Sequence, residues 1–269
     1  MNQRTIWEWN LMAYNFGGYA KRFLYFFTKR EIFNAPKSNS ELVKASNSKR
    51  KAYLCGLGPS LKKVDINRVA GDTIVVNRFY KIGRDYPNFV PTYYLIIDRD
   101  FTKSEYVEDF KDAIEYYASK GTIFIFNSKM SKHPLLKKIP PKQLYFVSCI
   151  DGRVKVNKHY KINGLHPAFM NVVGEAILLL MLMGYKDISL LGCDFNSFAS
   201  TTQVHCYKDE NQKRLWTMYE ELYAYAIASK DHCDLAEISN KMGCKIVNST
   251  KGSLIDAYPI EIDHTIYIE

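Results

Sequence analysis

The segment Lys51-Ala-Tyr-Leu-Cys-Gly-Leu-Gly-Pro-Ser-Leu61 contains a short apolar run that leads directly into a turn with two glycines. Residues 53–55 predict a buried strand, and the two glycines allow the backbone to turn sharply and to bring its N–H groups close to a ligand. Pro59 and Ser60 are typical of the first turn of a helix, whose N-terminus favours anions. A strand, a glycine turn and a helix in this order hold a nucleotide phosphate in many α/β proteins. Because the third glycine of the dinucleotide fingerprint is absent, a tight turn without a ligand stays open as the alternative.

Further apolar, β-rich runs follow along the chain and alternate with segments of helical character. This alternation predicts an α/β fold with a single Rossmann-like, doubly wound and mainly parallel sheet. The expected strands cover residues 73–76, 92–97, 122–126, 184–191 and 245–247, and the expected helices cover 104–120 and 168–183.

A polar residue or a glycine follows almost every predicted strand. One such residue is most often part of an ordinary loop. In an open parallel sheet, however, the ligand crevice lies outside the carboxyl ends of the strands, so five or more strands that end this way favour a nucleotide-binding edge. The residues expected to meet there with the glycine turn are Asn77, Asp98, Asn127, Gly192, Asp194, Asn196 and Thr250.

Charge divides the chain into an N-terminal arm with its linker, residues 1–50, and a domain over residues 51–269. The net charge is +9, and residues 1–51 hold ten Lys or Arg and three Asp or Glu, a net of +7. The remaining +2 leaves the domain nearly neutral, which argues against a nucleic-acid-binding face.

The arm combines aromatic and basic residues over positions 5–30, with basic pairs on both sides of residues 23–27. Interfacial membrane helices have this composition, although the apolar run is too short to span a bilayer. Packing on the domain or on a second copy of the chain is the alternative. The six cysteines show no zinc spacing, and no secretory signal is recognised, so a cytoplasmic protein with reduced thiols is expected, at most peripheral on the inner membrane face.

Three segments in order carry a resemblance to a known family: Gly56-x-Gly58-Pro59-Ser60-Leu61, then Asn77-Arg78-Phe79-Tyr80, then Gly184-Tyr-Lys-Asp-Ile188 leading to Gly192-x-Asp194-Phe195. Over roughly residues 51 to 263 the chain resembles the bacterial sialyltransferases of glycosyltransferase family 42. It is also similar to Rossmann-like proteins with a pterin-diphosphokinase-like domain.

The resemblance implies a GT-A-like variant of the fold with a small lid, and inverting transfer of a sugar from a CMP-activated donor without a metal or other cofactor. By this resemblance, Gly56, Gly58, Ser60 and Asn77 contact the nucleotide and its phosphate. Residues 192–196 line the donor pocket on the side of the cytidine. Asp98 falls near the reacting centre, where the family usually has asparagine. The implied partners are a sialic-acid-like or Kdo-like donor and a glycan or glycolipid acceptor of the bacterial surface.

The chain departs from the family at several positions. Leu57 replaces an asparagine in the glycine turn, and the family's Thr-Ser-Gly is matched only loosely by Asn171-Val-Val-Gly174. The two phosphate-binding tyrosines of the family are not clearly found, although Tyr207 could stand in for one. These differences bear on the identity of the donor sugar more than on the fold.

His205 is the candidate general base. It lies in a polar loop shortly after residues 192–196, at a position comparable to that of the family's base, and histidine titrates near neutral pH. A surface histidine without a role is the alternative, and His166 is the second candidate. Lys208 or Arg78 would offset the charge of the leaving phosphate.

Other functions stay open. Asp98-Arg99-Asp100 fits the D-x-D pattern of glycosyltransferases that hold a divalent ion against a UDP or GDP sugar. A nucleotide enzyme that transfers no sugar and a non-catalytic nucleotide-binding protein are the remaining classes. Homo-oligomer formation is compatible with all of them.

Overall fold

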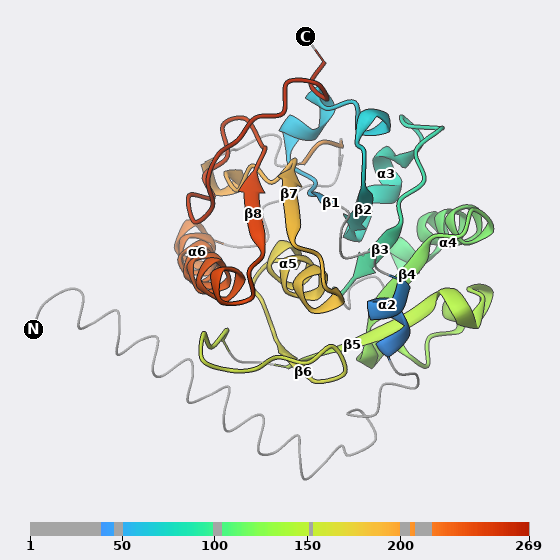
Figure 1. Ribbon diagram of the computed structural model, residues 1–269. Coiled ribbons are helices and arrows are strands. Elements are labelled where there is room, and N and C mark those ends of the chain that lie inside the picture. Colours follow the sequence, from blue (N-terminus) through green and yellow to red (C-terminus); the bar gives the residue numbers. More distant parts are fainter. Residues whose placement is uncertain are drawn as a thin grey trace, which may run out of the picture.

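The computed structural model describes residues 39–45, 51–98, 104–150, 153–199, 205–207 and 217–268. Within them, eight strands form one sheet in the order β6-β5-β4-β3-β2-β1-β7-β8, and every neighbouring pair is parallel (Figure 1). The predicted α/β Rossmann-like fold is therefore confirmed. The strands are β1 Lys51–Cys55, β2 Asp72–Val76, β3 Tyr93–Ile96, β4 Ile123–Asn127, β5 Leu144–Ile150, β6 Leu165–Pro167, β7 Asp187–Leu191 and β8 Lys245–Asn248.

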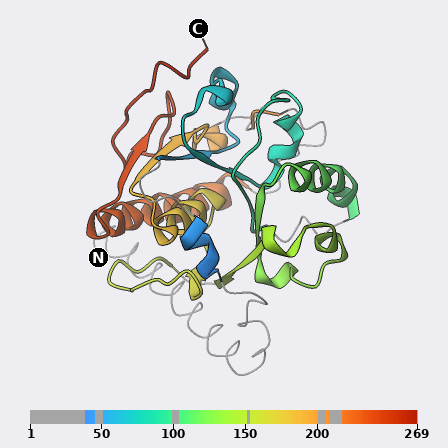
Figure 2. The ribbon, with the colours of Figure 1, turned by 45° about the vertical axis from the view of Figure 1, so that its right-hand side comes forward.

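Helices cover both faces of the sheet (Figure 2). The described helices are α2 Ser40–Ala45, α3 Tyr80–Gly83, α4 Ser104–Ser119, α5 Val172–Met183 and α6 Met218–Lys241. Helices α2, α5 and α6 belong to the apolar core on one face, and α3 and α4 to the core on the other. Alternation along the strands divides the side chains accordingly: Leu54 of β1 packs in the first core, and its neighbours Tyr53 and Cys55 pack in the second.

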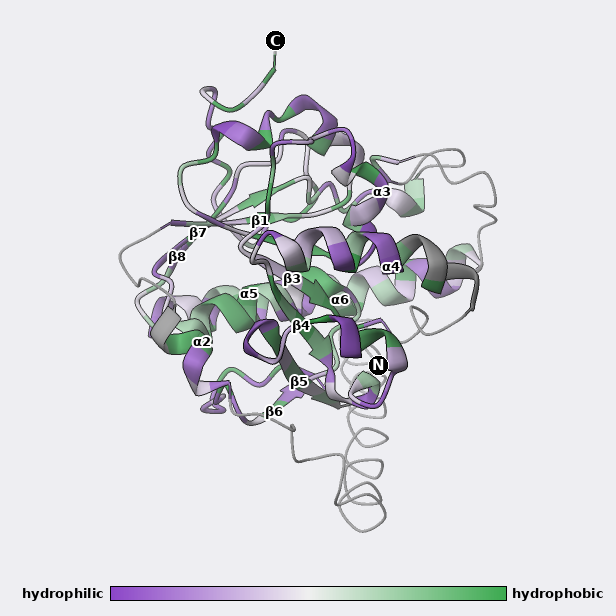
Figure 3. Ribbon diagram, turned by 90° about the vertical axis from the view of Figure 1, so that its right-hand side faces the viewer, coloured by the Kyte–Doolittle hydropathy of each residue, from purple (hydrophilic) through white to green (hydrophobic). Residues whose placement is uncertain are grey.

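Helix α5 is hydrophobic nearly all round, whereas α4 shows hydrophilic and hydrophobic sides (Figure 3). Because an apolar helix must be covered on all sides, α5 lies between the sheet and the flanking helices α2 and α6. Asn171 caps its first turn by accepting a hydrogen bond from the Gly174 N–H (3.0 Å), and Gly184 ends it in the left-handed region at φ 102°.

Each of the six strands expected from the sequence is present, as β1, β2, β3, β4, β7 and β8, and the two expected helices are α4 and α5. The sequence did not predict β5, β6 or α6. The helix expected to begin at Pro59 and Ser60 is a short 3₁₀ segment, Pro59–Lys63, so the turn after β1 has no α-helix N-terminus. The N-terminal arm at residues 5–30 lies outside the described residues, and of the polar loop that carries His205 only residues 205–207 are described. Among the residues that are described, none of the helices is long and apolar enough to cross a membrane.

Candidate functional site

The polar residues expected after the strands lie along one edge of the sheet. Since all strand pairs are parallel, their carboxyl ends share this edge, and the strand order places neighbouring ends side by side. From β4 to β8 the strand ends carry Asn127, Asp98, Asn77, the glycine turn at 56–60, residues 192–196 and Thr250.

The glycine turn after β1 is tied to the end of β7. Gly56 N–H donates to the Leu191 carbonyl (2.7 Å), and Gly58 N–H donates to the Gly192 carbonyl (2.8 Å). A Cβ atom at Gly58 would lie 1.9 Å from the Asp194 Oδ2 atom and 2.8 Å from the Gly192 oxygen. Glycine is required here because two backbone segments and a carboxylate meet at contact distance.

Asp194 is buried against this turn. Its carboxylate accepts hydrogen bonds from the Ser60 N–H (3.1 Å) and from the Ser60 hydroxyl (2.6 Å). The N–H groups of Gly56, Gly58 and Ser60 therefore all donate hydrogen bonds to other groups of the protein. A phosphate at this turn would need other donors, so the local structure differs from the anion-binding helix start that the sequence suggested.

Asn77, directly after β2, combines two unfavourable features. Its backbone is left-handed, at φ 43°, and its buried side-chain Oδ1 atom has no hydrogen-bond partner within the described part of the chain. Tyr94 holds the backbone in place: its hydroxyl donates to the Asn77 carbonyl (2.8 Å) and accepts from the Tyr80 N–H (3.0 Å). An unsatisfied buried acceptor costs about 1–3 kcal/mol, and strain of this kind is concentrated at binding sites.

The segment that carries His205 is attached to the glycine turn. Cys206 N–H donates to the Leu57 carbonyl (2.7 Å), and Cys206 and Tyr207 are buried. The His205 ring stacks on the Tyr207 ring with centroids 4.9 Å apart and planes at 23°. The fold therefore brings the candidate base to the sheet edge near β1, whereas Lys208 lies outside the described residues.

His166, the second candidate base, is fully buried and cannot reach a substrate. Its Nδ1 atom lies 2.6 Å from the Glu175 Oε1 atom and its Nε2 atom lies 3.1 Å from the Lys161 carbonyl oxygen. Burial opposes the charged imidazolium, but the Glu175 carboxylate outweighs it and the pKa of His166 is raised. His232 is buried as well, and its burial lowers its pKa to about 4.

The remaining strand ends have different environments. Asp98 is exposed at the end of β3, and Asn196 is half-buried beyond β7, after Phe195 with its left-handed backbone at φ 59°. Asn127 and Thr250 instead serve the fold. Asn127 donates to the Ile97 carbonyl (3.3 Å), and Thr250 accepts from the Cys193 N–H (3.0 Å).

No cluster of three or more His, Cys, Asp or Glu side chains that could hold a metal ion occurs within the described part of the chain. Asp100, the second carboxylate of the D-x-D pattern, lies outside that part.

The sequence did not predict a cavity of about 820 Å³ between α3, α4 and residues 206–207. Its lining comes from segments far apart in the chain, and no local motif marks them.

Neither a protein-family model nor a curated protein sequence matches this chain. Solved structures do match. The fold is similar to that of bacterial sialyltransferases. The sialyltransferase CstII from Campylobacter jejuni in complex with cytidine-5'-monophosphate has a TM-score of 0.48 and 16% identity, with 82% of this chain and 88% of that chain covered. The monofunctional α-2,3-sialyltransferase Cst-I from Campylobacter jejuni has a TM-score of 0.49 and 13% identity, covering 83% and 86%. A CstII complex with a trisaccharide acceptor and CMP has a TM-score of 0.46 and 16% identity, covering 79% and 85%.

Proposed function

We propose that this protein is an inverting, metal-independent glycosyltransferase that transfers an acidic sugar from a CMP-activated donor to a bacterial surface glycan. The donor sugar is of the sialic-acid or Kdo type. Residues 5–30 hold the enzyme at the cytoplasmic face of the membrane, where its acceptor glycolipid is assembled.

The observation that carries this proposal is the Oδ1 atom of Asn77 at the carboxyl end of β2, which is buried and has no hydrogen-bond partner among the described residues. Asn77 as a whole is only half-buried, so a rotation of its side chain would present this acceptor to a ligand that donates a hydrogen bond, and the cost of the unpaired atom would then be removed. A ribose hydroxyl or the cytosine amino group supplies such a donor. The glycine turn at 56–60 follows the neighbouring strand β1 and residues 192–196 follow β7, so both lie on the same sheet edge as Asn77, in the order that the family resemblance implies.

In the proposed reaction, His205 takes the proton of an acceptor hydroxyl. The hydroxyl oxygen bonds to the anomeric carbon on the face opposite the phosphate, and the bond between that carbon and the phosphate oxygen breaks. CMP leaves with the electron pair, and Arg78 offsets its charge. Asp98 lies beside the reacting centre and orients the acceptor or the sugar.

Thermal stabilisation by nucleotides tests the proposal. The purified full chain would be heated with CMP, CDP, UDP or GDP, each with and without Mn²⁺. CMP should raise the melting temperature without metal, and Asn77→Ala should abolish this shift. The Asn67→Ala variant is the control, since Asn67 is exposed and belongs to the short 3₁₀ segment Ile66–Arg68, which contains none of the candidate site residues.

Two other results would overturn the proposal. Stabilisation by UDP or GDP only with Mn²⁺ would assign the site to Asp98 and Asp100 and to the metal-dependent class. The absence of any nucleotide response would favour a non-catalytic protein.

A further inference from the structure

The cavity on the α3–α4 side of the sheet has the size of a ligand site. Its volume of about 820 Å³ lies within the range of roughly 300–1,000 Å³ that is typical of pockets for small molecules. Helices α3 and α4 lie next to one another on this face (Figure 3). The lining includes Lys62, Tyr80, Lys81, Arg84, Tyr116 and Tyr207.

Aromatic rings form fixed walls of this cavity. Tyr116 is 41% exposed, its hydroxyl donates to the Pro87 carbonyl (3.1 Å), and its ring meets the Tyr117 ring edge-on at 5.1 Å. Tyr207 is buried, and the Lys81 ammonium lies 5.3 Å from its ring centroid. These contacts fix the ring orientations before any ligand arrives.

Charged groups that can hydrogen-bond surround the rings. Lys62, Arg84, Asp85 and Asp112 all line the cavity, so it offers both donors and acceptors. Sugar rings have apolar C–H faces that pack on aromatic rings and hydroxyls that need both kinds of partner. The mixture of tyrosine with lysine, arginine and aspartate therefore suits an oligosaccharide better than a purely apolar ligand.

Three elements of the candidate active site also reach this cavity. Tyr207 stacks on His205 at 4.9 Å. Lys62 belongs to the same 3₁₀ segment as Ser60, and Tyr80 follows Asn77 by three residues and is fixed by the same Tyr94 hydroxyl. A ligand in the cavity thus lies beside the segment that carries the base.

We propose that the cavity binds the acceptor as an oligosaccharide and directs its terminal hydroxyl to His205. This inference rests on the proposed function, because it names the site of the second substrate. Tyr116 and Arg84 are binding residues in this proposal, and His205 remains the catalytic residue.

The test compares the unmodified full chain with three variants that alter the cavity. Tyr116→Ala removes an exposed ring, Arg84→Ala removes an exposed cation, and Ala113→Trp fills the space without removing a polar group. Tyr219→Ala is the matched control, since Tyr219 is a tyrosine of α6 with 76% exposure outside the cavity. Melting temperatures would establish that each variant is folded.

Binding would be measured on an array of defined neutral and sialylated oligosaccharides, and CMP binding would be measured separately. The oligosaccharides that the unmodified chain retains should bind at least tenfold more weakly to each of the three cavity variants. CMP affinity and the Tyr219→Ala control should stay unchanged.

Retention of the same oligosaccharides by all three cavity variants would overturn the proposal, as would an array on which no oligosaccharide binds. If CMP stabilises the protein but the cavity variants bind oligosaccharides as tightly as the unmodified chain, the cavity is not the acceptor site and the proposed function stands. If CMP does not bind at all, the proposed function itself fails.

Discussion

At the residue scale, Asn77 has two features that lower the stability of the folded protein. Its backbone is left-handed at φ 43°, and its Oδ1 atom accepts no hydrogen bond from any residue that the structure describes; both features destabilise the folded state. Glycine adopts the same backbone without strain and has no polar group to bury.

We therefore expect Asn77→Gly to raise the free energy of unfolding by about 1 kcal/mol in urea denaturation and to abolish the thermal shift by CMP. Asn127→Ala is the matched control, because that side chain is hydrogen-bonded to Ile97 (3.3 Å) and Lys129 (3.1 Å) and its loss should destabilise the fold. A destabilised Asn77→Gly that still binds CMP would show that the side chain serves the fold.

His205 supports a second prediction at this scale. If it is the general base, His205→Gln should lower kcat for transfer by about 10²–10⁴-fold and leave CMP affinity nearly unchanged. His264→Gln, a histidine exposed near the C-terminus, is the control and should retain full activity. Unchanged kcat in His205→Gln would assign the proton transfer to another group.

At the scale of elements, α6 supports the loop that follows β7. The Tyr225 ring packs on Phe195 at 4.5 Å and on Phe198 at 4.9 Å, and its hydroxyl accepts from the Ser197 N–H (3.1 Å). The helix itself begins with a capping box, in which Thr217 and Glu220 bond one another's backbone N–H groups.

Two variants of α6 separate support of the site from support of the fold. Tyr225→Phe keeps the ring but leaves the Ser197 N–H unbonded, and it should lower both the free energy of unfolding by about 1 kcal/mol and the CMP affinity several-fold. Thr217→Ala should lower the free energy of unfolding by about 1 kcal/mol, because the helix cap is lost, and should leave the CMP affinity unchanged. Calorimetric titration with CMP checks both, and equal affinity in the two variants would contradict a role for Tyr225 at the site.

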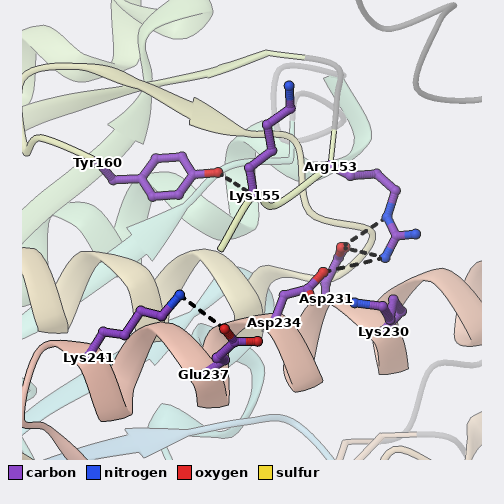
Figure 4. Close-up of polar contacts among 8 residues, drawn as sticks. All are labelled: Arg153, Lys155, Tyr160, Lys230, Asp231, Asp234, Glu237 and Lys241. Carbon is purple, nitrogen blue, oxygen red and sulfur yellow. Dashed lines mark hydrogen bonds and ion pairs between the residues drawn. The ribbon is translucent and has the colours of Figure 1, made fainter. Parts of the chain in front are cut away.

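At the scale of the whole molecule, buried charge joins α6 to the segment after β5. The Arg153 Nη2 atom lies 3.3 Å from the Asp231 Oδ1 atom and 3.9 Å from the Asp234 Oδ2 atom. The guanidinium is directed at both of these carboxylates of α6 (Figure 4). Burial raises the pKa of Asp231 to about 6, although Arg153 opposes the shift. The neighbouring His232 has a pKa lowered to about 4 by burial.

These two groups should affect acid stability in opposite directions. Between its ordinary pKa of 6.5 and about 4, His232 binds more protons in the unfolded chain, so the free energy of unfolding falls as the pH falls. Between about 6 and its ordinary pKa of 3.8, Asp231 binds more protons in the folded chain, so the free energy of unfolding rises as the pH falls.

Denaturation in urea at pH 7 and pH 5 would separate the two. His232→Gln should lose less stability on acidification than the unmodified protein, and Asp231→Asn should lose more, by about 1 kcal/mol in each case. Identical pH dependence in all three proteins would mean that neither side chain keeps its buried environment.

The sequence by itself determined the sheet and its polar edge. Apolar strands that end in Asn, Asp or Gly and alternate with helices leave a parallel sheet as the favourable arrangement, and parallel strands bring residues 56–60, Asn77 and residues 192–196 to one edge. It missed β6 because three residues carry no periodicity. It missed α6 because Asp231, His232 and Asp234 interrupt the buried face of the helix.

Only the tertiary structure decided which polar groups remain for a ligand. The N–H groups of the glycine turn donate to Leu191, Gly192 and Asp194, and His166 is buried against Glu175. The Asn77 amide oxygen has no partner among the residues that the structure describes. Each of these outcomes depends on a contact between segments distant in the chain. Local patterns predict which groups reach the edge, but the neighbours of those groups are set by packing, and hydrogen-bond partners and burial follow from the neighbours.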